Sequence, residues 1–248
     1  MFGPAVDRRA FLRTMRILEA RYPFHDWSRG MTPFEILVST ILSQNTTVAN
    51  ERRGLEGLRA RFGNLTPRNL ARARVADIAK AIWHAGLARR KAPRIRATAQ
   101  QLLETREGDL EQILALPTGR ARDALMALPG VGPKTADVVL TMAADRAVLP
   151  VDTHIARIAR RWGLVRPGGY EATRAALEAW TPPEKRKAWH LAIIAHGRDL
   201  CTARNPRCDR CPVQADCDWY RRRRAPRPRS QKGEREPAAN LRQKVKNR

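Results

Sequence analysis

The four cysteines of the chain all lie in one short stretch, CTARNPRCDRCPVQADC, as Cys201, Cys208, Cys211 and Cys217. Four thiolates this close in sequence can hold one metal centre. Only one Cys-x-x-Cys pair is present, whereas a zinc ribbon usually contains two. From the spacing alone, zinc and an iron–sulfur cluster are both open.

A second chemically suggestive stretch is LPGVGPKTADVV, residues 128–139. A helix is expected to end at Leu128, and Pro133 to begin the next one after a tight turn. Lys134 then lies in the first helical turn, where the helix dipole disfavours a cation, lowers its pKa and favours the neutral amine. Lys134 is therefore a candidate nucleophile for Schiff-base chemistry. The alternative is a solvated or phosphate-contacting lysine.

Asp152 can reach Lys134 if the chain folds back on itself. It is expected to be the N-cap of the helix in DTHIARIARR. A helix from Lys134 to Asp145 advances about 16 Å, and the extended residues that follow can span about 23 Å. The carboxylate can thus return to the amine, although a simple capping role is the alternative.

The turn before Lys134 can also bind phosphate. Gly130 and Gly132 allow another backbone to approach closely, and the amides at the start of the next helix point into the turn. Such a turn can hold one DNA phosphate without reading the base sequence. The alternative is an ordinary corner between two helices.

The charge of the chain favours a polyanionic partner. Lysine and arginine outnumber the acids 48 to 24, for a net charge of +24. The segment after Tyr220 holds 12 basic and 2 acidic residues, so residues 1–220 still carry +14. No apolar run approaches the roughly 20 residues of a membrane span, and the first residues, MFGPAVDRRAFLR, lack the uninterrupted apolar stretch of a secretory signal. We expect a soluble, cytoplasmic protein without membrane contact.

The elements that must position these residues are helices. Thr32, Pro33 and Glu35 form a capped helix start, and Thr66 begins a second one. The other stretches with apolar residues at spacings of three and four are bounded by Gly or Pro, and no useful two-residue alternation occurs. The predicted fold class is all-α.

Together, LPGVGPKTAD, VDTHIARIARR, HGRDLC and the cysteine spacing resemble the endonuclease III family of helix-hairpin-helix DNA glycosylases. The likeness extends from about Phe34 to Cys217. It implies that the four cysteines ligate a [4Fe-4S] cluster, and that this cluster orders a basic loop against DNA. Arg204, Arg207 and Arg210 lie between the ligands and are the candidate phosphate contacts of that loop.

The resemblance also implies roles for the site residues. Lys134 would attack the sugar C1′ while Asp152 stabilises the developing charge and moves protons. Side chains fill the gap left by the flipped nucleotide, and here Leu87 and either Gln44 or Asn45 correspond to the family's inserted residues. The candidate hairpin contacts to DNA are Gly130, Val131, Gly132 and Thr135.

The implied function is base-excision repair of double-stranded DNA that contains damaged bases or abasic sites. The chain would be a bifunctional glycosylase and abasic-site (β-elimination) lyase for damaged, chiefly oxidised, pyrimidines, acting as a nucleoid-associated monomer. The alternative is a DNA-binding, damage-sensing member with weak or no turnover. Val48 keeps it open, because the bacterial pattern has an acid there and one more residue before the glutamine.

Two α-helical domains with DNA bound between them are expected. Residues 31–150 would form a helical barrel that contains the hairpin. Residues 1–30 would join 151–220 in a discontinuous cluster domain. Residues 221–248 would be a basic, disordered tail with no counterpart in the family, and DLEQILALPTGRARDA before the hairpin is longer than in the compact bacterial enzymes.

Overall fold

The computed structural model describes residues 7–166 and 168–224. Within these ranges the chain is helical and contains no strand, which confirms the all-α prediction. None of the helices described is both long and apolar enough to cross a membrane. The α-helices are α1 (Arg8–Arg21), α2 (Pro33–Leu42), α3 (Val48–Phe62), α4 (Pro67–Arg72), α5 (Val75–Ala81), α6 (Ala88–Arg106), α7 (Glu111–Leu114), α8 (Thr118–Met126), α9 (Pro133–Ala143), α10 (Thr153–Trp162), α11 (Tyr170–Trp180), α12 (Arg186–Asp199) and α13 (Asp218–Arg224).

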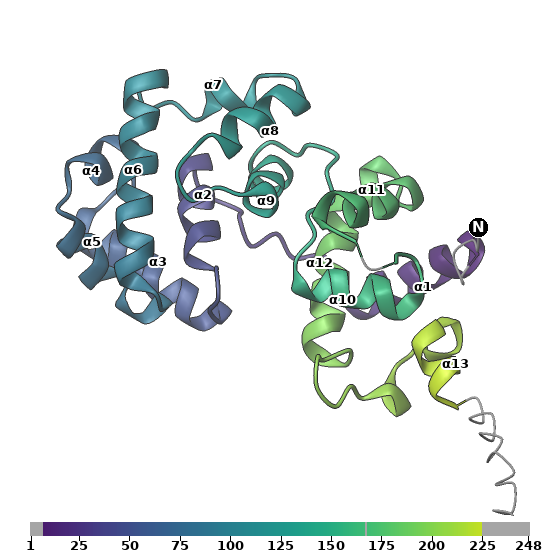
Figure 1. Cartoon of the computed structure of the whole chain (residues 1–248). Helices are drawn as coiled ribbons and strands as arrows, with labels where there is room; N and C mark the ends of the chain where they lie inside the picture. Colours follow the sequence, from purple (N-terminus) through teal and green to yellow (C-terminus); the bar gives the residue numbers. More distant parts are fainter. Residues whose placement is uncertain (1–6, 167, 225–248) are drawn as a thin grey trace, which may run out of the picture.

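The helices form two lobes, each around its own apolar core (Figure 1). The first core gathers buried side chains from Phe34 to Val148, on α2 to α9. The second combines Phe11, Met15 and Leu18 of α1 with side chains from residues 149–217. We propose that the two cores correspond to two domains with boundaries near residues 31 and 150.

The helix starts follow from side chains that cap them. Thr32 accepts a hydrogen bond from the amide of Glu35, whose carboxylate accepts one from the amide of Thr32, so α2 has a complete capping box with Pro33 in its first turn. Thr66 caps α4 in the same way, through the amide of Asn69. Both starts are those that the sequence predicts. The long segment before the hairpin forms α7 and α8.

A buried carboxylate joins the hairpin helix to the second lobe. Asp137 of α9 is fully buried and accepts hydrogen bonds from Arg122 Nε (2.6 Å) and Tyr170 Oη (2.7 Å). Tyr170 Oη in turn accepts a hydrogen bond from the amide of Val151 (3.3 Å). Because Val151 precedes Asp152, this chain of contacts fixes α9 relative to the start of α10.

The predicted boundary of the basic tail falls inside a helix. Residues 221–224 complete α13, where Arg222 pairs with Asp218 at 2.7 Å one helical turn earlier. Residues 225–248, the rest of the predicted tail, lie outside the described residues.

Candidate functional site

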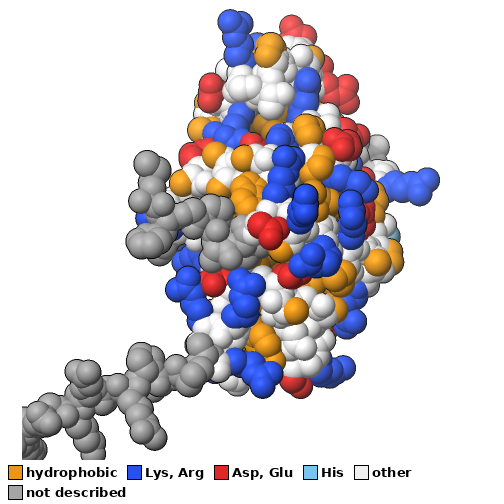
Figure 2. All heavy atoms as spheres, turned by 90° about the vertical axis from the view of Figure 1, so that its right-hand side faces the viewer, with side chains coloured by type: hydrophobic (Ala, Val, Ile, Leu, Met, Phe, Trp, Pro, Cys, Tyr) orange, Lys and Arg blue, Asp and Glu red, His pale blue; other side chains and the backbone are white. Residues whose placement is uncertain are grey.

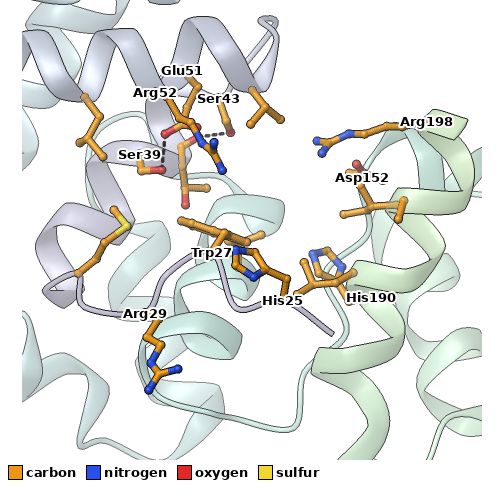
Figure 3. Close-up of a pocket in the computed structure, with 18 of the residues that line it drawn as sticks. His25, Trp27, Arg29, Ser39, Ser43, Glu51, Arg52, Asp152, His190 and Arg198 are labelled. Carbon is orange, nitrogen blue, oxygen red and sulfur yellow. Dashed lines mark hydrogen bonds between the residues drawn. The ribbon is translucent and has the colours of Figure 1, made fainter. Parts of the chain in front are cut away.

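A cavity of about 730 Å³ is lined by both lobes (Figure 3). Lys134 of α9 and Asp152 at the start of α10 both line it, so the structure brings the two predicted catalytic residues to one site. In Figure 3, Asp152 and Arg198 lie at one side, while Ser39 and Glu51 lie at the other. A cavity of this size with a few convergent polar groups is typical of a ligand site.

Lys134 lies in the first turn of α9, as predicted, and Gly132 precedes that helix without a side-chain cap. Burial lowers the pKa of Lys134, the nearby Asp152 carboxylate opposes this shift, and Arg198 adds to it. The net effect is a lowered pKa, which raises the fraction of neutral amine. The surroundings of Lys134 therefore favour a nucleophilic amine.

Asp152 caps α10, because its Oδ1 accepts a hydrogen bond from the amide of Ile155 at 2.8 Å. The predicted cap is therefore present, and the same carboxylate also lines the cavity. His190 lies beside it, with Nδ1 2.9 Å from the Pro150 carbonyl. Burial lowers the pKa of His190 to about 4, so the neutral ring donates from Nδ1 to that carbonyl. This bond holds α12 against the residues just before Asp152.

Two of the residues predicted to contact DNA at the hairpin turn have side chains that are buried in the protein. The Val131 side chain is buried in the first core, and its amide donates to the Leu128 carbonyl. Thr135 is also buried, with Oγ1 3.5 Å from Gln44 Nε2. The side chains of these two residues are therefore unavailable to DNA. The amides of Lys134 and Thr135 begin a helix and have no intrahelical acceptor, so they are the groups suited to a phosphate.

The two hairpin glycines differ in backbone conformation and in the space around them. Gly130 has a φ of +81°, in the left-handed region, and an added Cβ would lie only 3.0 Å from the Arg94 side chain. Gly132 has a φ of −100°, which any residue adopts, and its added Cβ would meet no atom within 4 Å. The open space at Gly132 leaves room for another molecule to approach the start of α9.

Gln44 and Asn45, the two candidates for one of the inserted residues, have different surroundings in the structure. Gln44 Nε2 donates to the Gly130 carbonyl at 3.3 Å, so this side chain is held against the hairpin. Asn45 is exposed and has a φ of +53°, in the left-handed backbone region. Of the two side chains, Asn45 is therefore the one that is accessible to another molecule.

Leu87 is the other predicted inserted residue. Its side chain is 44% exposed, and its φ of +52° lies in the left-handed region, which a leucine rarely adopts. It precedes α6 directly, at the tip of a short loop. An exposed leucine in this strained backbone region is consistent with an apolar wedge.

Glu51 and Ser39 line the cavity but are not among the predicted site residues. Ser39 Oγ donates to Glu51 Oε1 at 2.7 Å, and burial raises the pKa of the Glu51 carboxyl. Glu51 lies one helical turn after the exposed Val48 in α3. The acid that the bacterial pattern has at the position of Val48 is absent, but α3 supplies a carboxyl to the cavity from Glu51.

The raised pKa of Glu51 predicts a pH effect on stability. The fold favours the protonated carboxyl, so its contribution to stability is present at low pH and is lost as pH rises through the pKa of the folded state. Glu51→Gln keeps the acceptor for Ser39 without the charge. We expect the variant to gain stability relative to the parent between about pH 4 and about pH 8, measured by denaturant unfolding. An equal difference at both ends of this range would contradict the prediction.

The four cysteines surround a second, smaller cavity, which is backed by the rings of Trp162 and Trp219. Burial raises the pKa of the Cys211 thiol to about 11 and also raises the pKa of Cys208 and Cys217. A cationic centre is needed to hold such buried sulfurs as thiolates. The donor set therefore fits an iron–sulfur cluster held by four cysteines.

Positively charged and polar groups support the cysteine loop. Arg161 Nη1 donates to Cys201 Sγ at 3.1 Å and to the Thr202 carbonyl at 2.8 Å. The Arg161 guanidinium lies 4.8 Å from the centre of the Trp219 ring. His196 Nε2 is 3.8 Å from Cys211 Sγ. The three predicted phosphate contacts in this loop, Arg204, Arg207 and Arg210, are all exposed.

Comparison with known proteins defines the class of this fold and site. Residues 38–183 match the family model of the HhH-GPD superfamily base excision DNA repair protein. Residues 201–217, which hold all four cysteines, match the iron-sulfur binding domain of endonuclease III. The class is therefore a base-excision DNA repair protein with a helix-hairpin-helix and an iron–sulfur loop. The chain belongs to the endonuclease III family.

The family relationship extends over most of the chain. Endonuclease III of Thermotoga maritima is 35% identical over 191 residues, which are 77% of this chain and 85% of that protein. Endonuclease III of Escherichia coli is 35% identical over 188 residues, 76% and 84% of the two chains. A solved structure of a trapped covalent intermediate of endonuclease III with DNA aligns with a TM-score of 0.78 at 28% identity, and covers 88% of this chain and 99% of that one.

These findings confirm the expected function and cofactor. The protein is a DNA glycosylase with lyase activity in base-excision repair. It binds a [4Fe-4S] cluster. It also binds DNA. The family relationship supports an enzyme, and not the alternative of a damage sensor without turnover.

Removing one cysteine is expected to disrupt the cluster loop. Cys208→Ser replaces a thiolate with a poor ligand, so we expect loss of the brown colour of iron–thiolate absorption together with weaker DNA affinity. Iron content, visible spectrum and DNA binding are measured on the same preparation. A variant that retained full iron and colour would show that Cys208 is not a ligand.

Proposed function

We propose that Lys134 and Asp152 carry out base removal and strand cleavage in the cavity between the lobes. The observation that carries this proposal is their common placement there, with burial lowering the pKa of Lys134. The neutral Nζ attacks the sugar C1′ while the bond from C1′ to the base nitrogen breaks and its electron pair leaves with the base. Asp152 stabilises the positive charge that develops at C1′ and moves the proton released from the amine.

The bond formed in this step then permits strand cleavage. Asp152 passes the proton taken from the Lys134 nitrogen to O4′ as the C1′–O4′ bond breaks. The nitrogen lone pair forms the C1′–N double bond of a protonated imine, and the sugar ring opens. Asp152, ionised again, accepts a C2′ proton, and the electron pair of that C–H bond forms the C2′–C3′ double bond. The bond between C3′ and its oxygen breaks at the same time, and the 3′ phosphate leaves with the bonding electrons. The four cysteines would hold the iron–sulfur cluster with no open position for substrate, so its contribution is to order the loop that bears Arg204, Arg207 and Arg210.

The flipped base is proposed to enter the cavity on the side of Ser39 and Glu51. Trp27, Leu55 and Val138 also line this cavity and provide apolar contacts to a planar ring. The Ser39–Glu51 pair supplies polar atoms that can meet the hydrogen-bonding edge of a base. This arrangement supports recognition of a damaged pyrimidine after it leaves the stack.

Double-stranded DNA is proposed to lie across both lobes, with a monomer bound to each lesion. Asn45 and Leu87 enter the duplex, the amides at the start of α9 hold one phosphate, and the loop arginines hold others. Lys and Arg side chains are spread over the face of the second lobe with fewer acidic ones between them (Figure 2). Such a positive surface attracts duplex DNA without sequence preference, in keeping with association with the nucleoid.

A panel of duplexes tests the substrate. Each duplex carries thymine glycol, dihydrouracil, uracil, 8-oxoguanine or a T:G mismatch in the same sequence, and base release is measured under single-turnover conditions. We expect the fastest release from thymine glycol and dihydrouracil, with Lys134→Gln as the control for enzyme-dependent release. Fastest release from 8-oxoguanine or from the mismatch would contradict the proposed specificity.

A further inference from the structure

Lys91 of α6 is a buried lysine that is not part of the catalytic cavity. Only 2% of its surface is exposed. Its Nζ donates to the carbonyl of Leu42 at 2.6 Å and to the carbonyl of Ala85 at 2.8 Å. Removing a cation from water is costly unless its N–H donors find acceptors. The fold must therefore keep these two carbonyls within hydrogen-bond distance of Lys91 Nζ.

The two carbonyls lie at the ends of two short helical elements, each followed by a different loop. Leu42 ends α2, and Asn45 follows it by three residues. Ala85 ends a short 3₁₀ helix, and Leu87 follows it by two residues. The Lys91 ammonium therefore lies between the bases of the two loops whose tips are Asn45 and Leu87.

The loops also lie side by side at their tips. A Cβ added to Gly86 would lie 4.0 Å from Thr46 Oγ1. Asn45 and Leu87 have φ values of 53° and 52°. A non-glycine residue in this left-handed region is strained and persists only where the surroundings impose it. The two strained tips thus need a fixed support.

Lys91 is suited to supply this support. The last carbonyls of a helix lack intrahelical partners, and a cation near them also interacts favourably with the helix dipole. One ammonium that caps α2 and binds the second loop at the same time sets the distance between the loops. Losing it would free both carbonyls and release both loops together.

We propose that Lys91 is a positioning residue that holds the Asn45 and Leu87 loops at a fixed spacing, so that both tips enter the duplex in the same step. This inference rests on the proposed function, in which these two side chains fill the space left by the flipped nucleotide. Lys91 itself contacts neither the base nor the sugar.

Lys91→Met tests this inference, because it keeps the apolar stem and removes the ammonium. Single-turnover base release is measured on dihydrouracil paired in a duplex and on dihydrouracil in a single-nucleotide bulge, where flipping costs less. We expect release from the paired site to fall by about tenfold or more, the scale for a misplaced group, with a much smaller loss on the bulge. The exposed Lys80→Met is the matched control and should change neither rate.

If Lys91→Met folds, an equal loss on both substrates, or no loss on either, would overturn the proposal. If Lys91→Met does not fold, Lys91→Gln, which keeps one side-chain donor group, is measured in the same way and must show the same selective loss. Asn45→Gly and Leu87→Gly remove the tips while tolerating the left-handed backbone. If neither slows release from the paired site, the proposed insertion fails. Both tip variants can slow release from the paired site while each double variant with Lys91→Met slows it by the product of the two single effects. In that case only the positioning role fails.

Discussion

Lys134→Gln is expected to abolish strand nicking and the formation of a borohydride-stable adduct with abasic-site DNA. Glutamine has no amine that can form an imine, so no covalent step remains. The amides at the start of α9 and the exposed loop arginines are unchanged, so binding to the same DNA should persist within about tenfold, or about 1.4 kcal/mol. Nicking, trapping and equilibrium binding on one abasic duplex measure the three quantities.

The contrast between activity and binding is the informative result for this variant. If binding falls as steeply as nicking, Lys134 acts through DNA affinity or folding, which is the phosphate-contacting alternative. Lys187→Gln is a suitable control, because Lys187 is a lysine of α12 that pairs with Asp26 and Asp145 rather than lining the cavity.

Asp152→Asn is expected to lower the rate of base release by about 10² to 10⁴, the scale for a group that transfers protons. The asparagine side chain can still accept from the Ile155 amide, so α10 keeps its cap and the variant should fold. What is lost is the negative charge that stabilises C1′ and opposes the lowered pKa of Lys134. Single-turnover kinetics with a dihydrouracil duplex measure the loss.

The pKa of the amine distinguishes this role from a purely structural one. Without the Asp152 carboxylate, the pKa of Lys134 should fall further, so the acidic limb of the pH–rate profile for trapping should move to lower pH. A variant with full activity, or one that is inactive only because its thermal unfolding midpoint collapses, would leave Asp152 as a simple helix cap.

The sequence contains enough information to predict where Lys134 and Asp152 lie relative to their helices. Pro133 and the following apolar spacing mark the start of α9, and the capping residue Asp152 marks the start of α10, so local rules place both residues. The four cysteines are adjacent in sequence, and their common site follows from their spacing. These predictions depend on short-range signals, which propensity and capping determine well.

The contacts that depend on packing could not be predicted in the same way. Gln44 and Asn45 are neighbours of similar polarity, and only the position of the hairpin shows that Gln44 bonds to the Gly130 carbonyl. Thr135 is polar but faces inward from α9. Glu51 and Lys91 look like ordinary charged residues of surface helices. Their contacts with Ser39 and with the Leu42 carbonyl arise because α2 packs against α3 and α6.

The most direct test of the account is to identify the residue that forms the covalent bond. The full chain is incubated with abasic-site duplex DNA and borohydride, the adduct is digested, and the modified peptide is sequenced by mass spectrometry. The structure predicts a single adduct on Lys134, absent from Lys134→Gln. An adduct on another lysine, or one formed by Lys134→Gln at the parent rate, would contradict the assignment of the nucleophile.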